Sequence, residues 1–207
     1  VDKQPPNILQ INNKDNLDEK GQKLILNGYA RDNYQRNRLA DGIVEASSND
    51  IIIVSDLDEI PNLKSLNFEK IQNKIIQFKQ KMFYYKLNLY YPNFKWFGSK
   101  ACRKKNLISP QWLRNIKSKK YSKFRIDLIF NKKKYSDVFY VLDGGWHFTC
   151  IRTPAELEYK LLNFAHHYEF EKSGLKKEDL KKLILEKRVM YDHDIDQKGD
   201  KWSGKSK

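Results

Sequence analysis

The 207-residue chain carries 40 Lys and Arg residues against 26 Asp and Glu residues, so its net charge at neutral pH is +14. This length suits one domain with a proper hydrophobic core, and an aromatic content of 13% argues against disorder throughout. The positive charge favours an anionic partner: nucleic acid, a phosphorylated small molecule or an acidic membrane surface.

Cysteine usage and hydropathy indicate the compartment. The two cysteines, Cys102 and Cys150, lie far apart and form no Cys-x-x-Cys pattern, so neither a zinc site nor a disulfide framework is indicated. No apolar run approaches the roughly 20 residues that span a bilayer, and no signal-peptide pattern opens the chain. We therefore expect no transmembrane segment and a cytoplasmic location, with peripheral attachment to a membrane surface as an open alternative.

In chain order, we expect a loosely packed lead-in segment at residues 1–28, the main domain at 29–191 and a solvated C-terminal tail at 192–207. Within the domain, apolar residues at helical spacing predict a helix over residues 29–47 that runs into a strand at Ile51–Val54. Four consecutive β-branched residues predict that this strand is buried on both faces. A helix followed by a buried strand is half of a βαβ unit, so we expect an α/β fold.

Three carboxylates follow that strand within four residues: Asp56, Asp58 and Glu59. In open α/β sheets ligands bind beyond the carboxyl ends of the strands, and Asp56 and Asp58, two residues apart, should project from the same side. Mg²⁺ and Mn²⁺ prefer such oxygen ligands and commonly lie between carboxylates and substrate phosphates. A bare Asp-x-Asp also fits a solvated acidic turn closed by Pro61, so the metal site is a hypothesis that depends on its context.

Periodicity and capping signals predict the remaining elements. They are an amphipathic helix over residues 68–78, a strand over 82–91, a short helix from Pro110, a helix from Pro154 and a last helix over 176–191. The helix from Pro154 follows the capping box formed by Thr153 and Glu156.

A second informative stretch is Gly144-Gly145-Trp146-His147, which lies between two β-rich pieces. Consecutive glycines beside a Trp and a His imply a backbone that another group approaches closely. A tight bend with a core Trp and a structurally bonded His explains the stretch equally well.

The strand-end Asp-x-Asp admits three chemistries, which are nucleotide-sugar transfer, nucleotidyl transfer and metal-dependent phosphoester hydrolysis. The last two would need further carboxylates, which residues 192–196 supply only if the tail folds back. A basic nucleic-acid-binding protein is a further alternative, because basic residues alternate with aromatic ones over residues 79–135.

Four blocks of the sequence, in this order and at this spacing, resemble glycosyltransferase family 17: Arg31–Arg36, Ser55–Pro61, Gly144–Thr149 and Lys160–His166. That family includes the enzyme that adds the bisecting β-1,4-linked N-acetylglucosamine to the core mannose of N-glycans. The resemblance implies a GT-A-like nucleotide-sugar-binding fold with a mixed central sheet flanked by helices. It also implies metal-dependent, inverting transfer from a uridine-diphosphate sugar to a glycan acceptor, with no nucleic-acid partner.

The resemblance further implies roles at the donor site. Asp56 and Asp58 would hold Mn²⁺ or Mg²⁺ and the donor, and His147 would complete the metal shell. Arg31 and Arg36 match basic positions before the acidic block, and the planar fork of a guanidinium suits phosphate recognition.

The remaining roles concern the sugar and the acceptor. Trp146 would stack on a sugar or base, and an aromatic and basic groove built from residues around 90–100 and Trp146 would take the acceptor. Glu59 and Asp143 are both candidates for the catalytic base. The family's first strand and loop have no counterpart before residue 29, so the resemblance predicts an incomplete N-terminal unit, as in a truncated or minimal bacterial or viral member.

Overall fold

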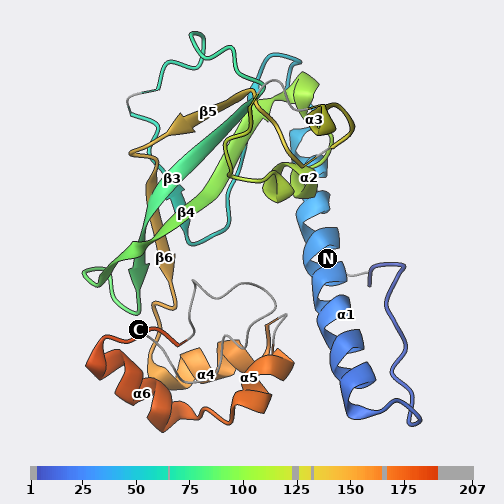
Figure 1. The fold of residues 1–207 in the computed structure, drawn as a ribbon, viewed down its shortest axis with the longest axis vertical. Coiled ribbons are helices and arrows are strands. Elements are labelled where there is room, and N and C mark those ends of the chain that lie inside the picture. Colours follow the sequence, from blue (N-terminus) through green and yellow to red (C-terminus); the bar gives the residue numbers. More distant parts are fainter. Residues whose placement is uncertain (1–3, 65, 123–125, 132, 165–166, 191–207) are drawn as a thin grey trace. The chain divides into compact units, whose positions relative to one another are not determined.

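The computed structural model describes residues 4–64, 66–122, 126–131, 133–164 and 167–190. The chain divides into two compact units, which we describe separately (Figure 1). The sheet unit comprises residues 36–83 and 90–149, and the helical unit draws on residues 1–35, 84–89 and the chain from residue 150. The division into lead-in, main domain and tail stays a prediction, and residues 192–207 lie outside the described part of the chain.

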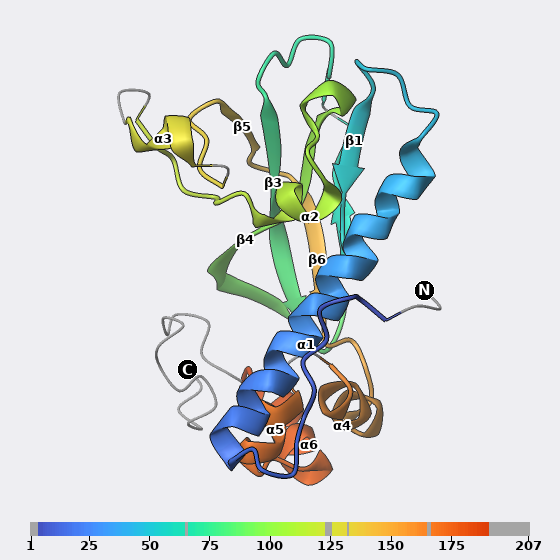
Figure 2. The same ribbon diagram turned by 90° about the vertical axis from the view of Figure 1, so that its right-hand side faces the viewer.

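A six-stranded mixed sheet forms the sheet unit, so the expectation of an α/β fold with a mixed sheet is confirmed (Figure 2). Its strands are β1 (Ile51–Val54), β2 (Glu59–Pro61), β3 (Ile75–Tyr84), β4 (Tyr90–Arg103), β5 (Val138–Val141) and β6 (Gly145–Thr149). Five of them follow the order β1-β4-β3-β6-β2, and β5 pairs with β3. The β3–β5 pair is parallel, whereas β1–β4, β3–β4 and β2–β6 are antiparallel.

Strand β1 lies at the residues predicted for it and contacts core clusters on both faces of the sheet. Ile52 and Val54 are buried on one face, and the partly buried Ile51 and Ile53 pack on the other. The predicted half βαβ unit is wrong, because β1 lies at the sheet edge and pairs antiparallel with β4. That pairing joins segments about fifty residues apart, which local periodicity does not reveal.

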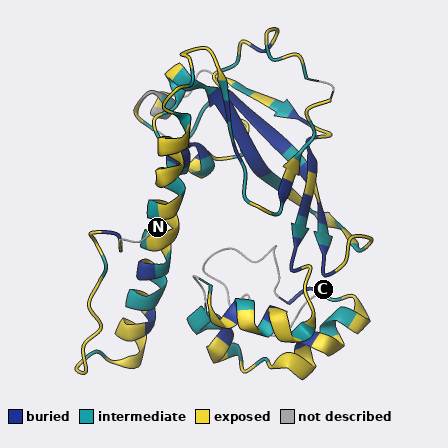
Figure 3. Cartoon of the chain, turned by 180° about the vertical axis from the view of Figure 1, so that it is seen from behind, coloured by how far each residue is buried: buried dark blue, intermediate teal, exposed yellow. Residues whose placement is uncertain are grey.

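The core lies on both faces of the central strands, which Figure 3 shows as buried along most of their length. On one face, α2 (Pro110–Asn115) packs on β1 and β4, and its Trp112 and Leu113 join the core. The helix begins where Ser109 and Pro110 predict it, since the Ser109 hydroxyl accepts a bond from the Trp112 amide at 3.1 Å. The short segments η1 (Leu39–Ile43), η2 (Lys104–Asn106) and α3 (Asp127–Phe130) complete the unit.

Two predictions around β3 are wrong. The segment expected to be a helix over residues 68–78 is a turn followed by β3, and the strand expected over residues 82–91 is the end of β3, a tight turn and the start of β4. The first four residues of β3, Ile75–Phe78, are all buried, so the two-residue alternation is lost there, and it returns only over residues 79–84. The turn contains neither Gly nor Pro; Tyr85 adopts the positive φ of 63° instead.

In the helical unit, α1 (Leu17–Arg38) begins inside the segment expected to be a loosely packed lead-in. Asn16 and Glu19 form a reciprocal capping pair at its start. The Glu19 amide donates to the Asn16 side chain at 2.9 Å, and the Asn16 amide donates to the Glu19 side chain at 3.0 Å. This signal is present in the sequence. The expected helix over residues 29–47 is therefore the second half of α1 followed by η1.

The C-terminal helices of the helical unit are α4 (Pro154–Leu162), α5 (His167–Ser173) and α6 (Lys177–Glu186). The capping box of Thr153 and Glu156 is present at the start of α4, which confirms that prediction. In the described part of the chain, no helix combines the length and the apolar character that crossing a bilayer requires. Cys102 and Cys150 are both buried, and no disulfide joins them.

Candidate active site

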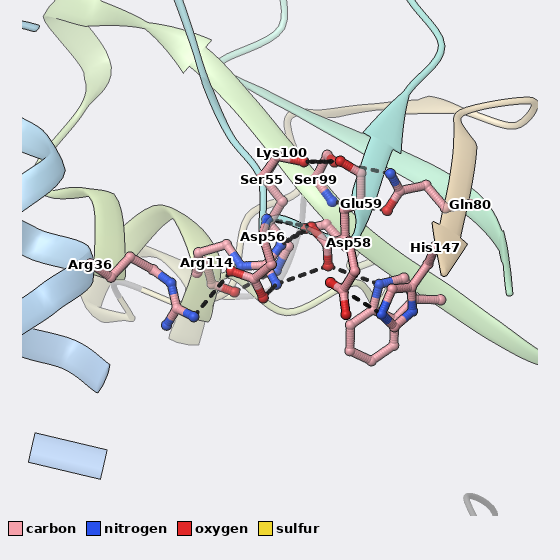
Figure 4. A network of polar contacts seen from close by, with 12 residues as sticks. Arg36, Ser55, Asp56, Asp58, Glu59, Gln80, Ser99, Lys100, Arg114 and His147 are labelled. Atoms are coloured by element: carbon pink, nitrogen blue, oxygen red, sulfur yellow. Dashed lines mark hydrogen bonds and ion pairs between the residues drawn. The ribbon is translucent and has the colours of Figure 1, made fainter. Parts of the chain in front are cut away.

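The acidic stretch forms a closed turn between β1 and β2, shown in Figure 4. The Glu59 amide donates to the Asp56 carbonyl at 3.0 Å, the Asp56 amide donates to the Glu59 carboxylate at 3.0 Å, and the Ser55 hydroxyl donates to the Glu59 carbonyl at 2.9 Å. The Asp58 carbonyl accepts from the Phe148 amide of β6 at 2.8 Å. These bonds hold the Asp-x-Asp in one conformation at the end of β1.

Glu59 is the buried centre of a group of side chains around the acidic turn, which we call the Glu59 cluster. Its own side chain has no exposed surface. Arg114, from α2, donates Nη1 to Glu59 Oε2 at 2.9 Å and Nη2 to Glu59 Oε1 at 3.0 Å. Trp96 of β4 donates its Nε1 to Glu59 Oε1 at 3.0 Å. A buried carboxylate persists only when its charge is paired and its lone pairs are bonded, and both conditions are met here.

Asp56 lies between two arginines. Its Oδ2 accepts from Arg114 Nη2 at 2.7 Å, and its Oδ1 accepts from Arg36 Nη2 at 3.2 Å. Arg36 also donates to the Gln111 side chain at 2.6 Å. The Arg114 side chain is only 11% exposed and links Asp56 to the buried Glu59. The Arg36 side chain is 24% exposed, so it can reach an incoming anion.

His147 lies beside the second aspartate of the pair. Its Nε2 is 3.6 Å from Asp58 Oδ1, and its ring stacks on Trp96 with a centroid distance of 4.7 Å and an interplanar angle of 19°. It reaches this position because it pairs with Glu59 across β2 and β6, so both side chains point to the same face of the sheet. Its buried Nδ1 has no hydrogen-bond partner among the described residues.

Gly98 gives these side chains room to converge. A Cβ atom at this position would lie 2.3 Å from Glu59 Oε1, 2.3 Å from Trp96 Nε1 and 2.4 Å from Gln80 Oε1. Arg114 Nη1 also donates to the Gly98 carbonyl. No side chain fits here without displacing bonded groups, so glycine is required by this close approach.

Lys100 is a buried cation beneath the cluster and anchors the end of α2. Its Nζ donates to the carbonyl of Arg114 at 2.6 Å and to that of Ile116 at 2.5 Å. Burial and, to a smaller extent, the positive charge of Arg114 together lower the pKa of Lys100 to about 7, although the negative charge of Glu59 opposes the shift. The lysine therefore positions the helix end that presents Arg114.

A row of hydroxyl and amide groups continues the network from β1 to β3. The Ser55 and Ser99 hydroxyls lie 2.5 Å apart, and Gln80 Nε2 donates to the Ser99 hydroxyl at 3.0 Å. The Ser99 amide donates back to Gln80 Oε1 at 3.2 Å. Three strands are thereby tied to the start of the acidic turn.

Asp143 and Trp146, two other residues singled out from the sequence, have different surroundings. Asp143 is exposed at the turn between β5 and β6. Lys81 Nζ lies 3.2 Å from its Oδ1, and the side-chain Nδ2 of Asn62 donates to its carbonyl at 3.2 Å. Trp146 is 38% exposed and pairs with Ile60 across β6 and β2, so it faces away from His147. Neither has a direct bond to the Glu59 cluster among those that the structure shows.

Arg31 belongs to the helical unit, where its Nε donates to the Gln4 side chain at 3.1 Å. Its predicted role at the donor therefore stays a prediction. In the fourth block of the resemblance, Ala165 and His166 lie outside the described residues.

The donor set at Asp58 and His147 fits a divalent cation in part. A carboxylate oxygen and an imidazole nitrogen face one another, but both oxygens of Asp56 already accept bonds from arginines. Among the described residues, no group of three or more His, Cys, Asp and Glu side chains gathers closely enough to hold a metal by itself. A cation here would take its other ligands from substrate phosphates and water, as Mg²⁺ commonly does.

Sequence reasoning missed four residues of the cluster: Trp96, Gly98, Lys100 and Arg114. Trp96, Gly98 and Lys100 lie in the aromatic and basic stretch that was expected to face an acceptor. Arg114 follows a well-predicted helix start, but nothing in the sequence indicates that α2 packs at the end of β1.

Comparison with known proteins supplies one match. The family model described as "Glycosyltransferase family 17" matches residues 11–193. Neither the curated proteins nor the solved structures include a significant match to this chain.

Proposed function

The chain belongs to glycosyltransferase family 17, and we propose that it moves a sugar from a nucleotide-sugar donor to a glycan acceptor at the cluster around Asp56 and Asp58. Family membership makes the chain a glycosyltransferase. The proposal adds a uridine-diphosphate sugar such as uridine-diphosphate N-acetylglucosamine as the donor, Mn²⁺ or Mg²⁺ as the cofactor, a GT-A-like arrangement of the donor site, an inverting mechanism and a cytoplasmic location.

One observation carries the proposal: the Asp-x-Asp turn is closed by hydrogen bonds and lies between two arginines and a histidine. A nucleoside diphosphate needs positive charge along its phosphates, and a guanidinium fork supplies it with two bonds at once. Arg36 is the partly exposed member of the pair. It can turn from Asp56 to a phosphate while Arg114 keeps Asp56 in place.

In the proposed reaction, an acceptor hydroxyl attacks the anomeric carbon of the donor from the face opposite the diphosphate. The bond between that carbon and the diphosphate oxygen breaks, and the diphosphate leaves with the electron pair. The hydroxyl proton passes to a carboxylate base. A cation held at Asp58 and His147 would neutralise the charge that develops on the diphosphate.

Accessibility separates the two carboxylates proposed as the base. Both oxygens of Glu59 accept bonds from Arg114, and the side chain has no exposed surface. Asp143 is exposed, so an acceptor hydroxyl can approach it. On this difference in exposure we propose Asp143 as the base and Glu59 as a residue that positions the turn.

Trp146 remains the proposed stacking residue for a sugar. Because it points to the opposite face of β6 from His147, that sugar would have to extend across the β2–β6 edge. This fits an extended glycan acceptor better than the donor sugar.

Calorimetric titration with uridine-diphosphate sugars, with and without Mn²⁺, tests the proposal. We expect saturable binding that requires the metal and is lost in Asp58→Asn. Asp41→Asn, in an exposed ion pair with Arg38, is the matched control and should bind normally. If no uridine-diphosphate sugar shows metal-dependent binding, the proposed donor and cofactor are wrong.

A further inference from the structure

Half of the net charge of the chain falls in one short stretch of its sequence. Residues 117–134 contain eight basic residues and one acidic residue, a net charge of +7 out of +14. The basic residues are Lys117, Lys119, Lys120, Lys123, Arg125, Lys132, Lys133 and Lys134. Lys123, Arg125 and Lys132 lie outside the described residues, so we give the name basic loop to the described residues 117–122, 126–131 and 133–134.

The two arms of the basic loop lie side by side. The Lys117 amide donates to the Lys133 carbonyl at 2.8 Å, and the Lys134 ammonium lies 5.9 Å from the centre of the Tyr121 ring. The short helix α3 lies between the arms in sequence and projects from the sheet unit in Figure 2. We call the described lysines of the two arms the stalk (Lys117, Lys119, Lys120, Lys133 and Lys134), and α3 together with the preceding Ile126 the tip.

The tip exposes large apolar side chains. Ile126, which precedes α3, is 74% exposed, and Phe130, at its end, is 84% exposed. Single exposed apolar residues are ordinary, but here two lie at the tip of a strongly basic stalk.

We propose that the basic loop docks the protein on an anionic lipid bilayer. Ile126 and Phe130 enter the boundary between head groups and acyl chains, and the exposed lysines of the stalk bind lipid phosphates. Apolar insertion and electrostatic attraction reinforce one another, as stable peripheral binding requires. The proposal concerns a surface outside the candidate active site and does not depend on the donor or the metal.

A lipid surface fits the loop better than a nucleic acid does. A single-strand binder presents aromatic faces on which bases stack. The tyrosines near the stalk already have ring partners: Lys134 lies over Tyr121, Lys120 lies 5.7 Å from the centre of the Tyr140 ring, and Tyr135 contacts Trp112. The side chains that stay exposed at the tip, Ile126 and Phe130, are apolar and suit insertion among lipid acyl chains.

Vesicle flotation of the full chain tests the proposal. We expect binding to vesicles of phosphatidylcholine mixed with phosphatidylglycerol and none to phosphatidylcholine alone. The double variant Lys119→Gln/Lys120→Gln should weaken binding about 30-fold, because about 1 kcal/mol per basic residue corresponds to about fivefold each. Ile126→Ser/Phe130→Ser should abolish flotation. The side chains of both variant pairs are exposed, so circular dichroism should confirm unchanged folding.

Matched controls come from α6 in the helical unit. Lys181→Gln/Lys182→Gln removes the same charge, and Leu185→Ser removes a side chain that is 71% exposed; both should float like the parent protein. If Lys181→Gln/Lys182→Gln weakened vesicle binding as much as Lys119→Gln/Lys120→Gln does, net charge alone would explain the binding and the proposal would be overturned. Binding of a single-stranded oligonucleotide that the stalk variant loses and the tip variant keeps would also overturn it.

Discussion

Removing the guanidinium of Arg114 tests the central claim about the site, namely that this side chain holds a buried carboxylate in place. In Arg114→Met, Glu59 keeps its bonds from the Trp96 side chain and the Asp56 amide but loses its only ion-pair partner among the described residues. Met approximates the length of the aliphatic part of Arg, so the change removes charge and donors more than volume.

The expected cost follows from burial. The side chains of Glu59 and Arg114 are 0% and 11% exposed, so water cannot replace the lost partner. Breaking one side of a buried ion pair costs about 3–5 kcal/mol. Since a domain has only about 5–15 kcal/mol of net stability, Arg114→Met should be far less stable than the parent protein.

Urea unfolding, followed by tryptophan fluorescence, measures this free energy. The control is Arg38→Met, which removes one partner of an ion pair in which both side chains are 56% exposed and should cost less than about 1 kcal/mol. Adding Glu59→Gln to Arg114→Met should recover part of the loss, because the uncompensated charge is gone. If Arg114→Met costs no more than Arg38→Met, the buried pair does not stabilise the site as we reason.

Three further predictions concern neighbouring positions. Gly98→Ala should cost about 1–3 kcal/mol and weaken donor binding, since its methyl group would displace bonded side chains, whereas Gly42→Ala, with open space around it, should be nearly neutral in the same urea assay. Because the pKa of Lys100 is lowered to about 7 in the folded state, the unfolded chain binds more protons above that pH. Stability should therefore rise from about pH 7 towards pH 10 by at most about 1.4 kcal/mol per unit, and a Lys100→Met variant with the same rise would contradict this. Asp143→Asn should lower kcat for sugar transfer at least about 100-fold with little change in donor affinity, and an unchanged kcat would remove Asp143 as the base.

The local elements that short-range chemistry dictates were predictable. The four β-branched residues of β1, the Ser109 cap of α2 and the Thr153 capping box of α4 each depend on residues within one turn or strand. The start of α1 was missed although Asn16 and Glu19 signal it in the same way.

The central strand was not predictable from its own residues. Its first four residues, Ile75–Phe78, are all buried, so the apolar residues there do not alternate and their spacing imitates a helix. The hairpin turn that follows was hidden because Tyr85 adopts a conformation usually taken by Gly.

For the site, the sequence by itself determined the chemical groups: the Asp-x-Asp after a buried strand, an arginine before it, and a histidine beside two glycines. Only the tertiary structure decided their partners. Arg114 reaches Glu59 because α2 packs on β1 and β4, and His147 shares a face with Glu59 because of the β2–β6 register. Those contacts join segments tens of residues apart, and long-range packing, rather than local propensity, determines which distant side chains meet.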